Sequence, residues 1–472
     1  MQTQDSALQE AERLVASSAY GSADFARGLD SLLRAAEAGS VSAQLTLGHV
    51  YSQVHLIPDA ARQAAVWYRR AAAQSDPLAQ NRLADLHMIG LGVSQSDAAA
   101  FDLCRALAER GYAVAQCNFA YMLMEGIGHE ADAVRAASFY LRAAAQGEPR
   151  AYFNLGLMYA TGIGLCRDEV LAWAWMENAR RQGYPGSEAA LREMESTLPA
   201  ASRGEARSIT QRIEANFIGL QQRLAAAPRL LSSAEDYRRV LEENFAALGL
   251  DACALDPMRR PVPGPSQGPH VPAAPVRLAE QPQVFSVDEF ISRSECAHLL
   301  TLAALDLKPA HKLTTDILSQ ENTAFNGNMV ALRAVLCDAV VRNVERRVGG
   351  VFGLPASRVE PLTVLRYQGG QRYAPHVDYF DAARLADNLR NGDHAGQRIA
   401  SFLVYLRPAD EGGETHYLKI GKKVTPRERM ALCHYNCRRD GTPDPDTLHT
   451  GEPVAQGEKW LARTTLRERS FY

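Results

Sequence analysis

A repeat of 36 residues limits the N-terminal part of this chain to very few folds. Small residues keep the same place in consecutive units, as at Ala43, Ala79, Ala115 and Ala151. Pairs of glycines recur at the same interval, at Gly90/Gly92, Gly126/Gly128 and Gly162/Gly164. A unit of this length predicts two helices that cannot bury their apolar face alone. Neighbouring units therefore stack, and small residues let the helix backbones approach one another.

Each unit is predicted to run as a helix, a glycine-containing turn, a second helix and a short turn. The second-helix segments include WYRRAAAQS, FYLRAAAQG and WAWMENARRQG. The units resemble Sel-one-like repeats, relatives of the tetratricopeptide repeats, over about residues 22 to 190. The first unit departs from the pattern because Ser52 to Ile57 lack the glycine pair. We therefore predict an all-α solenoid over residues 1–199 and capping or connecting helices over residues 200–250.

A proline-rich segment separates this helical part from the rest of the chain. Seven prolines lie between residues 257 and 275, in a stretch with little apolar content. Such a composition predicts a semi-rigid, extended linker over residues 251–282. The 472 residues also exceed what one hydrophobic core usually holds, so a second domain is expected over residues 283–472.

Composition narrows the partners and the compartment only slightly. A net charge of -3 gives no electrostatic reason to expect nucleic acid or an anionic membrane as partner. No apolar run approaches the roughly 18 residues of a transmembrane helix. The first residues, MQTQDSALQEAERL, lack the basic and apolar blocks of a secretory signal. The eight cysteines are scattered, which favours reduced thiols and a cytoplasmic location.

The second domain changes from helical to strand-like patterns along its length. VFSVDEFISRSECAHLLTLA begins as a strand and passes into a helix, and a second helical stretch, MVALRAVLCDAVVRNVERRVGGVFG, follows. The strand-like segments are PLTVLRYQ, RIASFLVYLR, GGETHYLK, RMALCHYN and VAQGEKWLARTTLRER. Helices followed by several short strands predict an α+β domain built on a sandwich or barrel.

Four residues in this domain have the types and the order of a metal and keto-acid site. His376 and Asp378 are two residues apart, so on a strand both side chains would lie on the same face. With His449 they would supply two imidazoles and one carboxylate to one side of Fe(II), which leaves open positions for a keto acid and O2. Lys459 is expected on the strand after His449 and paired with it, so that its ammonium could face an anionic ligand several ångströms from the metal.

The segments LRYQGGQRYAPHVDYF, ASFLVYL, EGGET and LHTGEPVAQGEKW resemble the prolyl 4-hydroxylase-like family of 2-oxoglutarate/Fe(II) dioxygenases, over roughly residues 283 to 472. The resemblance implies a double-stranded β-helix, or jelly roll, with iron in the mouth of the barrel. It implies that His376, Asp378 and His449 are the catalytic iron ligands. It further implies that Lys459 binds the distal carboxylate of 2-oxoglutarate, and it makes Tyr367 and Tyr405 candidate donors to the same ligand.

Other polar residues of the domain leave alternatives open. Thr415 is a weaker candidate for the 2-oxoglutarate site, and Arg398 fits a structural role or one at the substrate entrance. A zinc site at Cys433, His434 and Cys437 is disfavoured because no second ligand pair has a usual spacing. Three histidines are set aside as surface or core residues: His394, His416 and His434.

The reaction implied is hydroxylation of an unactivated carbon, with 2-oxoglutarate and O2 as co-substrates and ascorbate as a further candidate cofactor. Asp378 favours hydroxylation, since related halogenases lack this carboxylate. The first hypothesis for the substrate is a prolyl residue of a peptide or protein, with the repeats as the protein-interaction module. The segment from His311 to Met329 departs from the family pattern, with NTAFNGN at residues 322–328, which weakens the case for peptide recognition. The alternatives are hydroxylation of a small molecule or free amino acid, and a non-catalytic scaffold that senses 2-oxoglutarate or oxygen.

Overall fold

A computed structural model describes residues 2–17, 22–53, 59–184, 186–226, 233–248, 250, 270–305, 307–309, 327–332, 339–390 and 393–470. Most of the predicted linker, residues 251–269, lies outside them, as do residues 311–326 of the divergent segment and residues 54–58. The chain forms two compact units. One unit comprises Met1–Ser96, Ala273–Glu289 and Leu307–Tyr472, and the other comprises Asp97–Pro272 and Phe290–Asp306.

The first unit begins with helices that pair as the repeat predicts. They are α1 (Gln2–Ser17), α2 (Ala23–Glu37), α3 (Val41–Gln53), α4 (Ala60–Ala73) and α5 (Pro77–Ile89). Helix α3 packs on α4, where a Cβ on Gly48 would come within 2.6 Å of the Tyr68 ring. Only a residue without a side chain lets the two helices approach so closely.

Eight helices of the second unit continue the repeat and extend it. They are α6 (Asp97–Glu109), α7 (Ala113–Glu125), α8 (Ala133–Ala144), α9 (Pro149–Thr161), α10 (Glu169–Arg181), α11 (Gly186–Thr197), α12 (Ala200–Ala226) and α13 (Ala234–Ala247). Helices α12 and α13 pack on α10 and α8 respectively. The structure therefore confirms a helical repeat solenoid, and α12 and α13 pack against its helices.

The second glycine of each pair explains why the repeat needs it. A Cβ on Gly128 would lie 2.3 Å from the backbone oxygen of Asp97, in the second helix of the preceding repeat. The equivalent Gly164 meets Ala133 in the same way, at 2.7 Å. Both glycines also have positive φ, at 76° and 74°. The GxG turn thus joins consecutive repeats by backbone contact.

A helix from beyond the predicted linker also belongs to the second unit. This helix, α14 (Arg293–Leu305), packs against α9 and α11. The hydroxyl of Tyr121 donates to Glu295 Oε1 at 2.6 Å, and both side chains are buried. The other carboxylate oxygen of Glu295 accepts from the backbone N–H of Ser292, while the Ser292 hydroxyl accepts from the N–H of Glu295. This reciprocal capping box starts α14.

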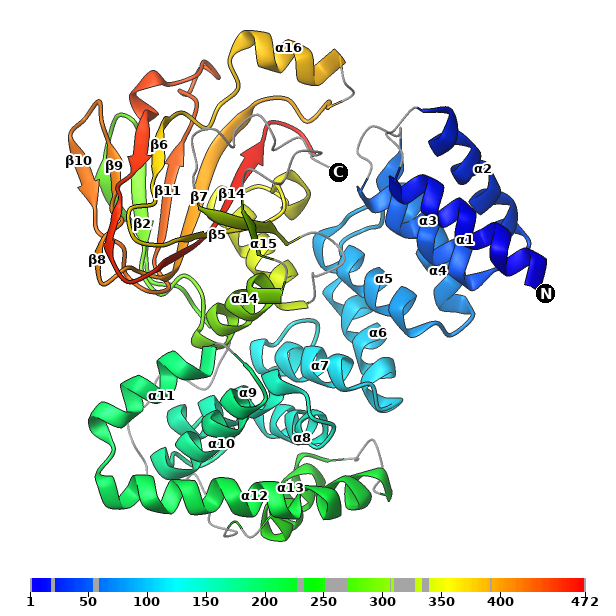
Figure 1. Cartoon of the computed structure of the whole chain (residues 1–472), viewed down its shortest axis with the longest axis vertical. Helices are drawn as coiled ribbons and strands as arrows, with labels where there is room; N and C mark the ends of the chain where they lie inside the picture. The colour runs from blue at the N-terminus through cyan, green and yellow to red at the C-terminus, as the bar shows by residue number, and fades with distance from the viewer. Residues whose placement is uncertain are drawn as a thin grey trace. The chain divides into compact units, whose positions relative to one another are not determined.

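The rest of the first unit is a jelly roll of antiparallel strands (Figure 1). The larger sheet has the order β1-β2-β11-β7-β14-β5-β4-β3, and the smaller sheet has the order β10-β9-β12-β6. The strands of the larger sheet are β1 (Val276–Ala279), β2 (Val284–Val287), β3 (Lys308–Pro309), β4 (Asn328–Ala331), β5 (Thr363–Tyr367), β7 (Arg398–Arg407), β11 (Ala431–Tyr435) and β14 (Lys459–Arg467). Those of the smaller are β6 (Tyr373–His376), β9 (Thr415–Tyr417), β10 (Lys422–Val424) and β12 (His449–Gly451); β8 (Glu411–Gly412) pairs with β13 (Val454–Gln456).

The sheet begins earlier than the predicted linker boundary. Residues 276–279 were expected in the linker, yet they form β1, because their backbone pairs with β2 in an antiparallel ladder. Between the sheets, alternate side chains of β5, β7, β11 and β14 form an apolar core that includes Leu365, Leu403, Leu432 and Leu461. This core surrounds the pocket described below.

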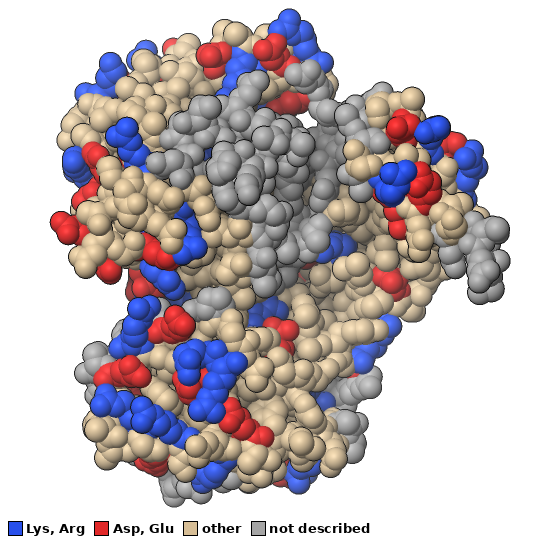
Figure 2. Space-filling model, in the orientation of Figure 1, with Lys and Arg blue, Asp and Glu red and all other residues tan. Residues whose placement is uncertain are grey.

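One helix covers the outer face of the larger sheet. Helix α15 (Ala339–Val351) is followed by Phe352, whose ring packs against Phe285, Phe402 and Tyr435 of three adjacent strands. The remaining helical elements are α16 (Ala382–Arg390) and the short 3-10 turns η3 (Ala356–Arg358) and η4 (Pro445–Thr447). No helix among the described residues is both long and apolar enough for a membrane span. On the face drawn in Figure 2, basic and acidic side chains are interspersed.

Candidate active site

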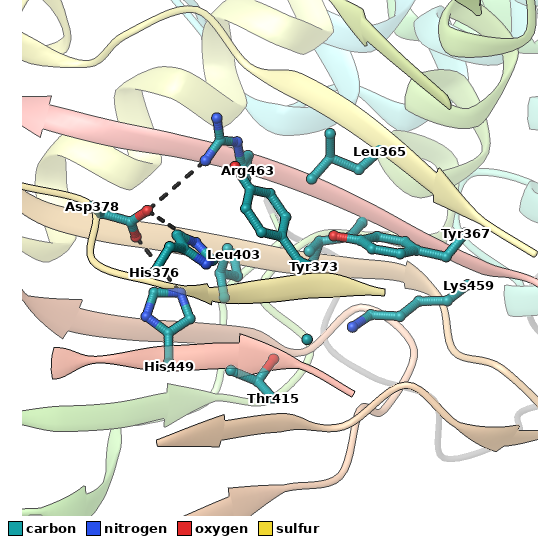
Figure 3. A pocket seen from close by; sticks show the side chains of 12 residues that line it. Leu365, Tyr367, Tyr373, His376, Asp378, Leu403, Thr415, His449, Lys459 and Arg463 are labelled. Carbon is teal, nitrogen blue, oxygen red and sulfur yellow. Dashed lines mark ion pairs between the residues drawn. The ribbon is translucent and has the colours of Figure 1, made fainter. Parts of the chain in front are cut away.

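His376, Asp378 and His449 converge at one end of a pocket between the two sheets (Figure 3). Their ligand atoms all lie within 4.8 Å of one another, and no other group of three metal-binding side chains is found in the described parts of the chain. His376 ends β6 and faces His449, the first residue of β12, across the ladder. Asp378 follows β6 in a bend, not on the strand as expected, and its Oδ1 lies 3.5 Å from His376 Nε2. The bend still returns the carboxylate to the two imidazoles.

Backbone carbonyls orient both imidazoles toward the pocket. The Nδ1 atom of His376 lies 2.8 Å from the Ala374 oxygen, and the Nδ1 atom of His449 lies 2.9 Å from the Thr447 oxygen. A carbonyl only accepts, so each Nδ1 carries the proton. Each Nε2 therefore presents a lone pair, which is the form that binds a metal.

Burial and the neighbouring side chains set the protonation states of His449 and Asp378. Desolvation and the neighbouring His376 lower the pKa of His449 to about 3, so its imidazole stays neutral. Burial alone would raise the pKa of Asp378, but the surrounding imidazoles of His376 and His434 hold it well below its ordinary value. Two imidazoles and one carboxylate fit a divalent cation such as Fe(II).

Lys459 lies at the other end of the pocket. It is the first residue of β14, in the larger sheet, and not on a strand paired with that of His449 as expected. Its side chain is 1% exposed, and its ammonium donates to the Gly413 carbonyl at 2.6 Å. Burial lowers its pKa to about 8. The described residues form no salt bridge with this ammonium, and only the charge of Glu414 acts against the effect of burial, so the cation fits an anionic ligand in the pocket.

The two predicted tyrosines stand on either side of the Lys459 ammonium. Its Nζ lies 5.1 Å from the ring centroid of Tyr367 and 5.4 Å from that of Tyr405. Tyr367 lines the pocket and is paired with Lys459 in the ladder. Tyr405 does not line it; its hydroxyl lies 2.7 Å from that of Thr415, which does. Thr415, the weaker candidate, is thus better placed for a ligand than Tyr405.

Several residues close to the site were not predicted from the sequence. Tyr373 stacks on the His376 ring with centroids 4.0 Å apart. Arg463, four residues after Lys459 on β14, lines the pocket and points to Asp378, with Nη1 3.9 Å from Oδ1 (Figure 3). His434, which the sequence analysis set aside, lies behind Asp378. Strand alternation could have placed Arg463 and Lys459 on one face.

The two remaining candidates belong to the structural frame. Arg398 is buried and forms a two-pronged ion pair with Glu360, whose other partner is Arg467. This geometry favours the structural role left open for Arg398. Cys433 and Cys437 are free thiols, and the described residues around them do not form a cluster that could hold zinc.

Comparison with known proteins identifies both parts of the chain. The profile described as "2OG-Fe(II) oxygenase superfamily" matches residues 362–466. The Sel1 repeat profile matches four times, at residues 42–76, 77–112, 113–148 and 149–184. Among curated proteins, "Probable prolyl 4-hydroxylase 3" of Arabidopsis thaliana is 33% identical over 207 residues, 39% of this chain and 68% of the relative. "Prolyl 4-hydroxylase 5" of the same plant is 34% identical over 218 residues, with shares of 41% and 71%.

Solved structures with detectable similarity fall into the same two groups. One is the viral collagen prolyl hydroxylase of Paramecium Bursaria Chlorella virus-1, with 24% identity, a TM-score of 0.30, and coverage of 39% of this chain and 95% of that one. Another is a Sel1 repeat protein from Oxalobacter formigenes, with 24% identity, a TM-score of 0.36, and coverage of 51% and 96%.

Proposed function

This chain is a 2-oxoglutarate-dependent dioxygenase that belongs to the 2OG-Fe(II) oxygenase superfamily, and on that premise we propose that it hydroxylates a prolyl residue of a peptide or protein. The observation that carries the proposal is one pocket with two imidazoles and a carboxylate at one end and a buried ammonium at the other. Those two ends match the metal and the distal carboxylate of a five-carbon keto diacid.

In this proposal His376, Asp378 and His449 hold Fe(II) through two Nε2 atoms and one carboxylate oxygen. When bound, Fe(II) supplies the oxygen chemistry that couples oxidation of 2-oxoglutarate to succinate and CO2 with insertion of a hydroxyl into a substrate C–H bond. The three side chains leave the remaining positions of the metal open for the co-substrates. Tyr373 packs against His376 and keeps its ring in place.

Lys459 binds the distal carboxylate of 2-oxoglutarate in the proposed complex. Its ammonium is held by the Gly413 carbonyl. Glycine suits this position because its φ is 74° and an added Cβ would lie only 3.1 Å from Lys459 Cδ. Tyr367 and Thr415 offer hydroxyls to the same ligand, while Tyr405 orients the Thr415 hydroxyl. The leucine side chains that line the pocket exclude water from the reacting groups.

The choice of substrate rests on the relatives and on the repeats. The curated relatives are named as prolyl 4-hydroxylases, and helical repeats commonly bind proteins. The repeats would raise the local concentration of a protein substrate near the pocket. Ascorbate as a reductant that sustains turnover, and a cytoplasmic location, belong to the same proposal. The opposing candidates are a small-molecule or amino-acid substrate and a scaffold without turnover.

The test is incubation of the full chain with Fe(II), 2-oxoglutarate, O2 and proteins of a cell lysate. Succinate is quantified, and peptide mass spectrometry searches for proline residues that gain one oxygen atom. We expect both signals, and we expect neither with the Lys459→Ala variant. Modification of small molecules alone would contradict the protein substrate. Metal binding without succinate formation under any condition would contradict the enzyme.

A further inference from the structure

A fully buried histidine lies behind the carboxylate of the proposed metal site. His434 is on β11, and its side chain has no exposed surface. Its Nδ1 atom is 2.9 Å from the Tyr417 hydroxyl, and its Nε2 atom is 3.6 Å from Asp378 Oδ2. Its ring centroid lies 5.0 Å from that of His449. An apolar side chain would fill this core position without the cost of burying two polar nitrogens.

The contacts of His434 select one arrangement of protons. If Nδ1 carried the proton, Nε2 would present a lone pair to a carboxylate oxygen. The Tyr417 hydroxyl would then accept that proton and would find no acceptor for its own proton among the described residues. If the Tyr417 hydroxyl instead donates to Nδ1, the Nε2–H faces Asp378 Oδ2 at 3.6 Å, which is too long for a hydrogen bond but is a favourable charge–dipole contact. Burial raises the pKa of Tyr417 well above its ordinary value, so its hydroxyl keeps the proton to donate.

Ser401 holds the same carboxylate oxygen from the neighbouring strand. Its hydroxyl donates to Asp378 Oδ2 at 2.6 Å and accepts from the Asn436 side-chain amide at 3.0 Å. Ser401 is the ladder partner of His434, so both side chains face the interior of the barrel together. Ser401 thus donates a hydrogen bond to Oδ2, and the His434 ring faces the same oxygen at 3.6 Å, so the two side chains together restrict the rotation of the carboxylate. Its Oδ1 then remains beside His376 Nε2.

We propose that Tyr417 and His434 act as one hydrogen-bonded pair that positions Asp378 for the metal. Tyr417 belongs to the smaller sheet, where it is the ladder partner of His449, and His434 belongs to the larger sheet. The pair therefore links two of the three proposed ligands across the interior of the jelly roll. Both are positioning residues, since neither touches the metal or a co-substrate. The inference rests on the proposed function of this site.

The test compares metal affinity in Tyr417→Phe, His434→Phe and the double variant of the full chain. Co(II) and anaerobic Fe(II) affinities are measured by calorimetry, and the absorbance of the Fe(II) complex with 2-oxoglutarate is recorded. Loss of such an indirect partner typically lowers metal affinity by about 10- to 100-fold. We expect that loss in each single variant and no further loss in the double variant. Tyr435→Phe is the matched control, because Tyr435 is the next residue on β11 and packs on Phe352 outside the barrel.

The His434→Gln variant controls for the loss of the imidazole ring itself, because the glutamine amide can still donate to Asp378. We expect it to recover part of the metal affinity that His434→Phe loses. Unchanged affinity in Tyr417→Phe, or losses that multiply in the double variant, would overturn the pair. A wild-type chain that binds Co(II) but never forms succinate would refute the proposed function alone, since the affinity comparison does not depend on turnover.

Discussion

Replacing Lys459 by methionine should have opposite effects on the ligand-free and the ligand-bound protein. Methionine has nearly the length of the lysine stem and no charge, so it fills the same buried space. Burial lowers the pKa of Lys459 from 10.5 to about 8. At pH 7 this difference corresponds to about 3 kcal/mol by which the buried ammonium destabilises the ligand-free fold. The Lys459→Met variant without ligand should therefore be more stable than the wild type, by up to that amount.

The two pKa values of Lys459 also give the sign of the pH dependence of stability. Between pH 8 and pH 10.5 the unfolded chain binds more protons at Lys459 than the folded chain does. The stability of the ligand-free wild type should therefore rise with pH across this range, and the rise should be missing in Lys459→Met. A bound dicarboxylate would pair with the ammonium, so saturating 2-oxoglutarate should flatten the slope of the wild type.

When 2-oxoglutarate is bound, the wild type should instead be favoured over Lys459→Met. Removing one partner of a buried charge pair costs about 2 to 5 kcal/mol, so the affinity for 2-oxoglutarate should fall by at least about 30-fold. Affinity for 2-oxoglutarate is measured by calorimetry with Co(II) present. Stability is measured by urea unfolding, from the unfolding transition whose midpoint shifts when 2-oxoglutarate is added. Affinity within threefold of the wild type, or equal pH slopes for the two ligand-free proteins, would refute the role assigned to Lys459.

Three further outcomes follow from contacts described above. Asp378→Ala should abolish succinate formation and lower Co(II) affinity by at least about 10-fold in calorimetry, and retained turnover would exclude Asp378 as a ligand. Gly128→Ala should lower the midpoint of thermal unfolding by several degrees more than Gly147→Ala. Both glycines have positive φ, but only at Gly128 would the added Cβ lie 2.3 Å from a backbone atom. Equal shifts would contradict the packing argument. Glu360→Gln should destabilise the fold by about 3 to 5 kcal/mol in urea unfolding, because two arginines lose a buried charged partner. Glu280→Gln, in an exposed ion pair, should cost under about 1 kcal/mol. A similar small effect in both variants would mean that the buried pairs contribute little.

The sequence predicted the repeat and the candidate site for different physical reasons. The repeat is local, since each glycine pair and each small residue acts within one unit and its neighbour. The four residues of the pocket were predicted because their order resembles a known family, and the structure brings all four to one pocket. The bend that carries Asp378 was not predicted, because the period of a strand does not reveal where the strand ends.

The residues that were missed depend on pairing between distant strands. His434 was set aside because a single histidine in an apolar strand has no sequence neighbour that marks it. The role proposed for His434 depends on Tyr417 and Asp378. These residues lie elsewhere in the sequence and approach His434 only when the two sheets pack together. The placement of Lys459 was wrong in detail for the same reason: its strand joins the larger sheet, between β7 and β5, which no local pattern specifies.

The capping box at the start of α14 limits how far the oxygenase half of the chain can be separated from the repeats. Glu295 uses one carboxylate oxygen to begin its own helix and the other to accept from Tyr121 of the repeats. A gene fragment that starts near residue 283 would keep every proposed ligand, yet it would strip α14 of its packing against α9 and α11. Recombination that moved this oxygenase to another chain would have to carry the repeats with it or replace the face they cover. A fragment of residues 283–472 is therefore expected to need a substitute for that face of α14.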